Sequence, residues 1–475
     1  MTMINDHIKN MLQDIVGIEN VVTDNASLLA YSYDATARYQ SLPDAMVAPR
    51  NTEEVASIVQ LCNTEQIPIV PRGSGTNLCA GTTPSEGGIV LTFKHMNQIL
   101  EIDEENLTMT VETGVYTKEV FEAADKVGLF YPPDPGSMHI SQIGGNISEN
   151  SGGLRGLKYG VTRDYVLGLE VVLPNGDVIN TGGKLAKDVA GYDLTRLLTG
   201  SEGTLGIITK AILKLIPKPE TKKTMLALYH DLDEAAKTVS AIIANRIIPA
   251  TLEFLDQETV KVVEDFAKIG LPTEAKAVLL IEQDGPPEVV SRDAEKIAAL
   301  CKENHAFEVQ IAETDEQAET DEQAEELTEA RRAALTALSR LKPTTILEDA
   351  TVPRSEIPKM VKAINEIADK YQVTICTFGH AGDGNLHPTC LTDARDEAEI
   401  ALVMQAFEEI FKEAAFLGGT ITGEHGVGMM KLPYLHLKTG EAGLEAMRAI
   451  KKALDPNNIM NPGKMLLLEE EAEVN

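Results

Sequence analysis

The sequence feature that most limits how this chain can fold is a glycine-rich run between Tyr131 and Gly160, YPPDPGSMHISQIGGNISENSGGLRGLKYG. It contains paired glycines at 144–145 and 152–153 and few large apolar side chains. Such a run contributes little to a hydrophobic core, so packing alone does not explain what holds it in place. Clustered glycines let the backbone approach a ligand closely. We therefore expect residues 131–153 to line a large ligand.

A second glycine-rich turn, PRGSGTN, runs from Pro71 to Asn77 and follows an apolar strand predicted at Ile67–Val70. Successive backbone N–H groups in such a turn can bind a phosphate. The turn does not match the dinucleotide-binding fingerprint, because Leu78 stands where the third glycine belongs, and it lacks the Gly-Lys-Ser/Thr of a P-loop. Taken alone, an anion-binding turn and an ordinary turn are equally good interpretations.

Histidines gather in the stretch GHAGDGNLHP, residues 379–388. His380 and His387 are seven positions apart, which does not place them on one helix face, but a glycine turn between them could bring both rings to one point. Two imidazoles and a carboxylate form a common metal site, and Glu424 lies downstream in GEHGVG. The alternative is that these histidines are hydrogen-bonded loop residues.

The composition limits the functional class. With 42 basic and 73 acidic residues the formal net charge is −31, which argues against binding to nucleic acid or to anionic lipid. The five cysteines are widely spaced and form no CxxC pair, a pattern typical of a reducing compartment. The N-terminus lacks the apolar core of a signal peptide, and no eighteen apolar residues run together. We expect a cytoplasmic protein that is peripheral to a membrane only through a partner.

A chain of 475 residues is expected to form two or three domains. The composition changes after Pro217 and Pro219, so we place a domain boundary at 217–222. The elements predicted before it are a helical segment at 1–42, strands at 45–48, 67–70, 166–173, 178–181 and 207–216, and a helix at 52–65. The first strand, helix and second strand form a predicted βαβ unit.

Strands and helices alternate after the boundary. The predicted strands are 224–230, 250–255, 277–283, 345–351 and 373–378, and the predicted helices are 232–246, 257–268, 288–304, 325–341, 355–371 and 396–416. The hexapeptide ETDEQA occurs at 313–318 and again at 319–324. This acidic repeat is typical of a solvated loop or helix extension.

Six motifs in their usual order resemble a known family. They are PRGSGTN, DPGSMHISQIGGNISENSGG, GSEGTLGIIT, GHAGDGNLHP, GEHGVG and DPNNIMNPGK, and they lie between residues 71 and 464. The resemblance that they carry covers the chain from residue 45 to residue 465. The sequence resembles the FAD-linked D-2-hydroxy-acid dehydrogenases of the vanillyl-alcohol-oxidase type, which include D-lactate dehydrogenase, D-2-hydroxyglutarate dehydrogenase and the glycolate oxidase flavin subunit. The resemblance implies oxidation of a D-2-hydroxy acid, D-lactate or glycolate, to the 2-keto acid.

The same resemblance implies an α+β fold with a two-subdomain FAD-binding domain and an inserted, ferredoxin-like cap domain. The implied domains are 1–219 for FAD, 220–420 for the cap and substrate, and 421–475 for a return to the FAD domain. FAD would be bound noncovalently. The residues implied at the cofactor are Arg72, Gly73, Ser74, Gly75, Thr76, Asn77, Pro135, Gly136, Ser137, Gly144, Gly145, Ser148, Asn150, Gly153, Gly203, Ile208 and Asn461.

By resemblance, His380, His387 and Glu424 ligate a divalent metal, zinc or manganese. His425 is then the general base while hydride passes to flavin N5, and Asn385 hydrogen-bonds substrate or water. The family carries an arginine for the substrate carboxylate in a Leu-Trp-x-x-Arg context. Arg331 matches that arginine, but this chain has no tryptophan, so the neighbouring Arg332 is the alternative.

Several properties stay open at this level. The electron acceptor is a quinone, an electron-transfer flavoprotein, an iron–sulfur subunit or oxygen, and a homodimer is the default assembly. The alternative function is a non-catalytic or partner-dependent flavin subunit of a multi-subunit oxidase. A metal-dependent hydrolase would leave residues 131–153 unexplained. An alkyl-glycerone-phosphate synthase relative should carry a cluster of basic residues for phosphate, and none is evident in the sequence.

Overall fold

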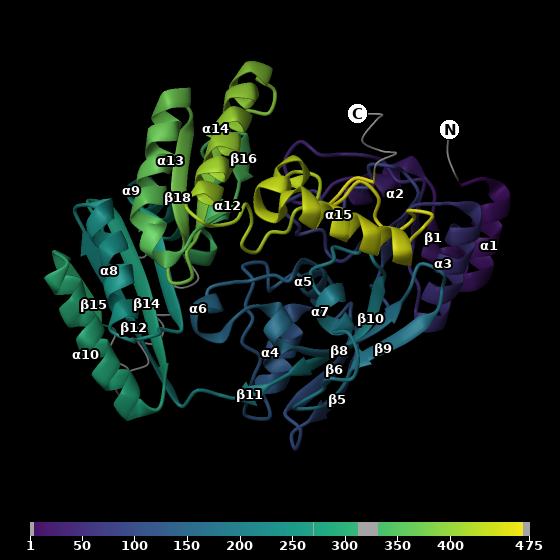
Figure 1. Cartoon of the computed structure of the whole chain (residues 1–475), viewed down its shortest axis with the longest axis horizontal. Helices are drawn as coiled ribbons and strands as arrows, with labels where there is room; N and C mark the ends of the chain where they lie inside the picture. Colours follow the sequence, from purple (N-terminus) through teal and green to yellow (C-terminus); the bar gives the residue numbers. More distant parts are fainter. Residues whose placement is uncertain (1–3, 269, 312–330, 469–475) are drawn as a thin grey trace. The chain divides into compact units, whose positions relative to one another are not determined.

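The computed structural model describes residues 4–268, 270–311 and 331–468 (Figure 1). The chain divides into two compact units. The first comprises Met1–Ser151, Val161–Lys218 and Glu424–Asn475, and the second comprises Gly152–Gly160 and Pro219–Gly423. Residues 152–160 therefore belong to the second unit, although the expected boundaries place them in the first domain. The acidic repeat at 313–324 lies outside the described residues.

The first unit contains three sheets. Its strands are β1 (Val21–Val22), β2 (Ala45–Val47), β3 (Ile69–Arg72), β4 (Ile89–Thr92), β5 (Ile99–Asp103), β6 (Thr108–Glu112), β7 (Leu129–Phe130), β8 (Val166–Val172), β9 (Val178–Gly182), β10 (Ile207–Lys214) and β11 (Ile216–Pro217). The four-stranded sheet has the order β1-β2-β4-β3, with β2, β4 and β3 parallel. The five-stranded sheet, β5-β6-β10-β8-β9, is antiparallel, and β7 pairs with β11.

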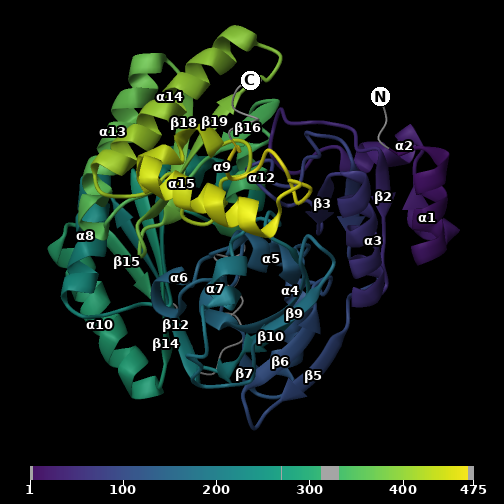
Figure 2. The ribbon, with the colours of Figure 1, turned by 45° about the vertical axis from the view of Figure 1, so that its right-hand side comes forward.

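The helices of this unit border these sheets. They are α1 (Asp6–Val16), α2 (Asn25–Leu28), α3 (Thr52–Glu65), α4 (Thr117–Asp125), α5 (Ile143–Glu149), α7 (Leu194–Leu198) and α15 (His436–Leu454), with 3₁₀ turns η1 (Ile18–Asn20), η2 (Leu29–Tyr31), η3 (Thr162–Tyr165) and η5 (Leu432–Tyr434). Figure 2 shows α1 and α3 side by side next to β2.

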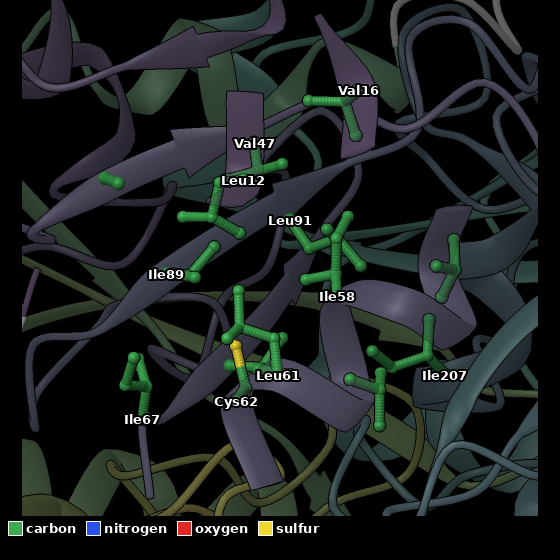
Figure 3. Packing of buried hydrophobic residues seen from close by; sticks show 14 of the residues in the cluster. Leu12, Val16, Val47, Ile58, Leu61, Cys62, Ile67, Ile89, Leu91 and Ile207 are labelled. Atoms are coloured by element: carbon green, nitrogen blue, oxygen red, sulfur yellow. The ribbon is translucent and has the colours of Figure 1, made fainter. Parts of the chain in front are cut away.

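The core of the parallel sheet follows from the pattern of α3. Asn51 caps the helix, because its side chain accepts the Glu54 N–H at 2.9 Å. Val55, Ile58 and Cys62 then point to one face at helical spacing and are fully buried. Figure 3 shows Ile58 and Cys62 packed among Ile89, Leu91 and other apolar side chains. Burial in this apolar cluster raises the pKa of the Cys62 thiol, so the residue behaves as a small hydrophobe.

The prediction of a continuous helical segment at 1–42 is wrong. Helix α1 ends at Gly17, which has a φ of 91° that a helix cannot accommodate. The 3₁₀ turn η1 and the short strand β1 follow, and the next α-helical turn begins only after Asp24, whose carboxylate accepts the Ser27 N–H. Helical spacing of apolar residues in α1 is therefore local to residues 6–16.

The C-terminal segment completes the parallel sheet of the first unit. The Ile69 N–H donates to Ile459 O at 2.7 Å, and the Asn461 N–H donates to Ile69 O at 2.8 Å, beside β3. Asp455 shapes this segment because its carboxylate accepts the Met460 N–H and pairs with the buried ammonium of Lys451 at 2.6 Å. The motif DPNNIMNPGK thus forms a turn that hydrogen-bonds to Ile69, at the beginning of β3.

The second unit is an eight-stranded sheet with helices packed on it (Figure 1). Its strands are β12 (Thr221–Tyr229), β13 (Thr251–Asp256), β14 (Ala277–Gly285), β15 (Glu308–Ile311), β16 (Thr344–Leu347), β17 (Ala350–Thr351), β18 (Thr374–His380) and β19 (Asn385–Thr392). Its helices are α6 (Gly156–Tyr159), α8 (Leu232–Ala244), α9 (Gln257–Ala267), α10 (Pro287–Glu303), α12 (Ala334–Leu338), α13 (Ile357–Tyr371) and α14 (Glu397–Phe416), with the 3₁₀ turn η4 (Arg354–Glu356). The order is β15-β12-β14-β13-β18-β19-β16, with β17 also paired to β19.

Strands β18 and β19 form the hairpin that carries the clustered histidines. The turn between them contains Gly384 with a φ of 91°, a conformation that favours glycine. A Cβ at Gly384 would also lie only 2.1 Å from Val352 O. Both the backbone conformation and the lack of space therefore exclude a side chain at this position. All of β19 is buried, and the sequence did not indicate this strand.

Among the described residues, no helix combines the length and apolarity that crossing a bilayer requires.

Candidate cofactor and metal sites

A pocket with about 540 Å³ of empty space, open solvent at its mouth included, lies within the first unit. It is bounded by the turn after β3, the end of β6, helix α5 and the start of β10. Its lining residues are Pro71, Arg72, Gly73, Gly81, Thr82, Phe93, Thr113, Gln142, Gly144, Gly145, Ser148, Glu149, Glu202, Gly203, Gly206, Ile207 and Ile208. Cofactor pockets combine an apolar lining with a few polar groups, as this one does.

A buried cation stands at one side of this cavity. Arg72 is 6% exposed, and its guanidinium donates to Thr82 Oγ1 at 3.2 Å and to Ala30 O at 3.5 Å, both neutral acceptors. Burial lowers the pKa of Arg72, and the nearby Asp34 acts against that change. A guanidinium held largely by neutral groups is suited to a phosphate, which it can bind through two parallel N–H donors.

The paired glycines of α5 differ in what surrounds them. A Cβ at Gly144 would lie 2.7 Å from the Cβ of Thr113, so protein packing alone excludes a side chain there. A Cβ at Gly145 would meet no protein atom within 4 Å, yet Gly145 lines the cavity. Protein packing therefore does not account for Gly145, whereas a ligand approaching the helix backbone does. The residues present fit a large cofactor with a phosphate group.

Seven of the seventeen residues expected at the cofactor line the cavity: Arg72, Gly73, Gly144, Gly145, Ser148, Gly203 and Ile208. Asn461 is placed next to it, because its side-chain amide donates to Gly81 O and Glu202 O. Asn77 likewise donates to the lining carboxylate of Glu149 at 2.7 Å. The other eight expected residues are not among the described residues that line the cavity. They are Ser74, Gly75, Thr76, Pro135, Gly136, Ser137, Asn150 and Gly153. Gly153 belongs to the second unit.

The contrast between the two glycines makes a prediction. Gly145→Ala should raise the unfolding free energy of the apoprotein by about 0.5–1 kcal/mol, because alanine favours the helix and the site is open. The same methyl group should weaken FAD binding. Gly144→Ala should destabilise the apoprotein by about 1–3 kcal/mol, because it overpacks Thr113. Denaturant unfolding and titration with FAD check both; wild-type FAD affinity in Gly145→Ala would contradict the assignment of this cavity.

In the second unit, the β18–β19 hairpin brings His380 and His387 together. Their ring centroids are 5.0 Å apart and the ring planes are nearly perpendicular, at 89°. Each Nδ1 faces a buried carboxylate: His380 Nδ1 hydrogen-bonds Glu253 Oε1 at 2.7 Å, and His387 Nδ1 lies 3.0 Å from Asp349 Oδ1. The expected turn geometry between the two histidines is therefore present.

Two further expected residues lie near this hairpin. Arg331 pairs with Glu253 through Nη2 and Oε2 at 2.6 Å, and its guanidinium stacks over Phe378 at 4.7 Å. Glu253 thus already neutralises part of the charge of Arg331. Asn385, the first residue of β19, accepts a hydrogen bond from Thr351 Oγ1 at 2.8 Å through its side-chain oxygen. That bond leaves the amide NH₂ of Asn385 as its donor group.

Glu424 and His425 belong to the first unit. Their side chains adjoin each other, with His425 Nε2 3.6 Å from Glu424 Oε1. The second unit ends at Gly423, whose N–H donates to Asp349 Oδ2 at 3.1 Å, and Glu424 is the next residue in the chain. The proposed ligands are thus divided between the units, two histidines in one and the glutamate in the other.

Sequence reasoning missed Glu253 and Asp349, the two carboxylates behind the histidines. Both side chains are fully buried. Glu253 stands between Leu252 and Phe254 in the buried part of strand TLEFLD, and a charge at such a position requires a partner. That isolated charge was the available signal for Glu253. Asp349 follows Glu348 in the short link between β16 and β17, and no comparable signal marked it.

Comparison with known proteins places these sites in a family. Residues 43–182 match the model "FAD binding domain", and residues 218–465 match "FAD linked oxidases, C-terminal domain". The glycolate oxidase subunit GlcD of Bacillus subtilis is 69% identical over 98% of this chain and 97% of its own length. GlcD of Escherichia coli K12 is 34% identical over 95% and 89%, and a D-lactate dehydrogenase of Anaerostipes hadrus is 35% identical over 92% of both chains.

Solved structures agree on the fold. The 4-ethylphenol oxidase of Gulosibacter chungangensis superposes with a TM-score of 0.79 at 20% identity, covering 98% of this chain and 97% of the other. p-Cresol methylhydroxylase gives the same TM-score at 20% identity over 96% of each chain. The predicted α+β fold of the vanillyl-alcohol-oxidase type is confirmed. Given the two family models and these identities, the chain belongs to the FAD-linked oxidases and is an FAD-linked oxidoreductase.

Proposed function

We propose that this enzyme oxidises a D-2-hydroxy acid or glycolate to the corresponding 2-keto acid. Relatives named glycolate oxidase subunit and D-lactate dehydrogenase, at 69% and 35% identity over more than nine-tenths of the chain, support glycolate and D-lactate as the candidate substrates. FAD supplies the hydride acceptor when it is bound. The chain's own residues then have to bind the substrate, orient it and remove the hydroxyl proton.

The observation that carries the metal part of the proposal is the carboxylate behind each imidazole. Metal-binding histidines usually present one ring nitrogen to the ion and the other to a carboxylate or carbonyl, which fixes the tautomer. His380 and His387 have this arrangement, with Glu253 and Asp349 at their Nδ1 atoms. Their Nε2 atoms are then the nitrogens that would hold a divalent ion such as zinc or manganese, with Glu424 as the third ligand.

The remaining groups have defined tasks in this proposal. Two histidines and one carboxylate leave coordination positions open, as in catalytic rather than structural sites. A metal bound there would supply a Lewis acid, which would make the substrate hydroxyl more acidic. A ring nitrogen of His425 takes the hydroxyl proton as the substrate loses hydride from its carbon, so the products are the 2-keto acid, reduced cofactor and protonated imidazole. Asn385 and the N–H groups of Arg331 not used by Glu253 orient the substrate.

The test is the visible spectrum of the FAD-loaded protein under anaerobic conditions. Glycolate, D-lactate and D-2-hydroxyglutarate are added in turn. We expect the flavin band to bleach with at least one of them, and L-lactate serves as the stereochemical control. A flavin band that none of the acids bleaches would reject the proposed substrate class and favour the alternative, a flavin subunit that depends on a partner for activity.

Metal removal makes a separate prediction. Dialysis against a strong chelator should abolish substrate-dependent bleaching and leave the FAD content unchanged, because the histidines are not among the described residues that line the cofactor cavity. Added Zn²⁺ or Mn²⁺ should restore bleaching. Metal analysis of the untreated protein should give about one ion per chain. Full activity in chelated, metal-free protein would exclude the metal from the mechanism.

A further inference from the structure

Two carboxyl groups that the proposed mechanism does not use meet inside the first unit. Glu149, at the end of α5, and Glu202, in the turn before β10, both face the loop GEHGVG. A Cβ at Gly426 would lie 2.1 Å from Glu149 Oε2 and 3.0 Å from Glu202 Oε1. The loop backbone is thus seated directly against both carboxyl groups, and only glycine fits at the point of contact.

Glu202 makes the stronger connection to this loop. Its Oε1 accepts the Val427 N–H and its Oε2 accepts the Gly428 N–H, both at 2.7 Å. Gly426 and Gly428 have φ values of 83° and 50°, so consecutive N–H groups of the loop converge on one anion. Such a concave backbone arrangement commonly binds a ligand phosphate, and here a side chain of the protein occupies it.

The backbone of Glu202 is itself held in an unfavourable conformation. Its φ is 52°, in the left-handed region that a glutamate rarely adopts. The Glu202 N–H donates to Ser148 O at 2.9 Å, and the Asn461 side chain donates to Glu202 O at 2.7 Å. Strain of this kind persists only where the surroundings fix it, and it is concentrated at functional sites. The turn thus aims the carboxylate of Glu202 at the loop.

The neighbouring Glu149 has the properties of a neutral acid. Burial raises the pKa of Glu149 well above its ordinary value, and the carboxyl groups of Glu202 and Asp34 raise it further. A hydrogen bond from Asn77 acts in the opposite direction. Burial raises the pKa of Glu202 as well, but the N–H bonds from Val427 and Gly428 and the nearby Lys431 act against that change. Of the two adjacent carboxyl groups, Glu202 is therefore the one better stabilised in its charged form.

We propose that Glu202 is a positioning residue: its carboxylate fixes the Gly426–Val427–Gly428 turn and thereby holds the preceding His425 in place for proton removal. This inference rests on the proposed function for the role of His425. The hydrogen bonds themselves do not depend on that role, so the two parts can be tested separately.

Glu202→Gln tests the fixation of the turn, because a glutamine has one acceptor oxygen and both oxygens of Glu202 are in use. The readout is hydrogen–deuterium exchange of peptides covering residues 425–430 in the FAD-loaded protein. We expect exchange about 10- to 100-fold faster than in wild type, since one charge-assisted bond to an N–H is lost. Exchange at the wild-type rate would overturn the proposal.

Glu119→Gln is the matched control. A single carboxylate oxygen of Glu119 accepts the Tyr116 N–H at 3.1 Å, so glutamine can replace it, and exchange at 425–430 should stay at the wild-type rate. Faster exchange in both variants would show a general loosening and would also overturn the proposal. Should Glu202→Gln fail to fold, Glu202→Asp keeps the charge but is one CH₂ shorter, and it should likewise speed exchange in the turn.

Kinetics of flavin reduction by glycolate or D-lactate test the link to His425. At saturating substrate, Glu202→Gln should reduce flavin about 10- to 100-fold more slowly than wild type, with KM changed by no more than about twofold. Faster exchange without slower reduction would overturn the positioning role. If no 2-hydroxy acid reduces wild-type flavin, the proposed function fails, while the exchange comparison still decides whether Glu202 fixes the turn.

Discussion

Replacement of His425 by asparagine is expected to slow flavin reduction by a 2-hydroxy acid by about 10²- to 10⁴-fold, the range that general acid–base catalysis usually contributes. Asparagine keeps a polar side chain of similar length but cannot take up the hydroxyl proton. FAD content should not change, because His425 is not one of the described residues that line the cofactor cavity. Stopped-flow measurement of the flavin band under anaerobic conditions gives the rate directly.

His7→Asn is the control for this experiment, because His7 is exposed on α1 and the substitution is the same. It should leave the rate of flavin reduction at the wild-type value. A His425→Asn protein that carries FAD and metal but reduces its flavin at more than about one-tenth of the wild-type rate would rule out His425 as the general base.

Glu253→Ala is expected to lower the unfolding free energy by about 3–5 kcal/mol, the cost of leaving a buried charge without its partner. The guanidinium of Arg331, 6% exposed, loses the carboxylate that lies 2.6 Å away, and His380 loses the acceptor at its Nδ1. Because the same residue orients a proposed metal ligand, metal affinity should fall about 10- to 100-fold. Denaturant unfolding and metal titration measure the two effects.

Glu258→Ala is the comparison variant, because it removes an ion pair of nearly the same length as the Glu253–Arg331 pair. The carboxylate of Glu258 pairs with Lys261 at 2.7 Å, but both side chains are about half exposed, so the expected loss is below about 1 kcal/mol. Similar losses in the two variants would mean that the Glu253–Arg331 pair is not buried in solution as the structure describes it.

Where local signals agreed with the tertiary structure, the sequence was a good guide. Helix α3 has the predicted bounds, 52–65, because the cap at Asn51 and the apolar spacing from Val55 to Cys62 specify the same helix. The strands predicted at 166–173 and 178–181 are present as β8 and β9, which pair as a hairpin. In both cases, residues close in sequence determine the element.

The candidate sites were only partly accessible to such reasoning. The glycines of the β18–β19 turn and the two histidines were recognisable, because the turn is local. Glu253 approaches His380 from another strand, and Glu202 reaches Val427 from far along the chain. Contacts of this kind follow from the strand order of a finished sheet or from the path of a loop, and neither is encoded in a short stretch of residues. Strand β19 was missed because polar residues, among them Asn385 and His387, stand at its buried positions and interrupt an apolar pattern.

The return of the C-terminal segment to β3 has a consequence for biosynthesis. As the chain leaves the ribosome, residues 219–423 of the second unit emerge before Ile459, whose carbonyl bonds the Ile69 N–H beside β3. The β3 edge of the parallel sheet therefore stays unpaired until residues 459–461 have been synthesised. Domains usually fold in the order in which they are synthesised, and a strand edge that is still unpaired is prone to aggregate with other chains. A nascent chain arrested before residue 455 should therefore depend on chaperones far more than the released protein does.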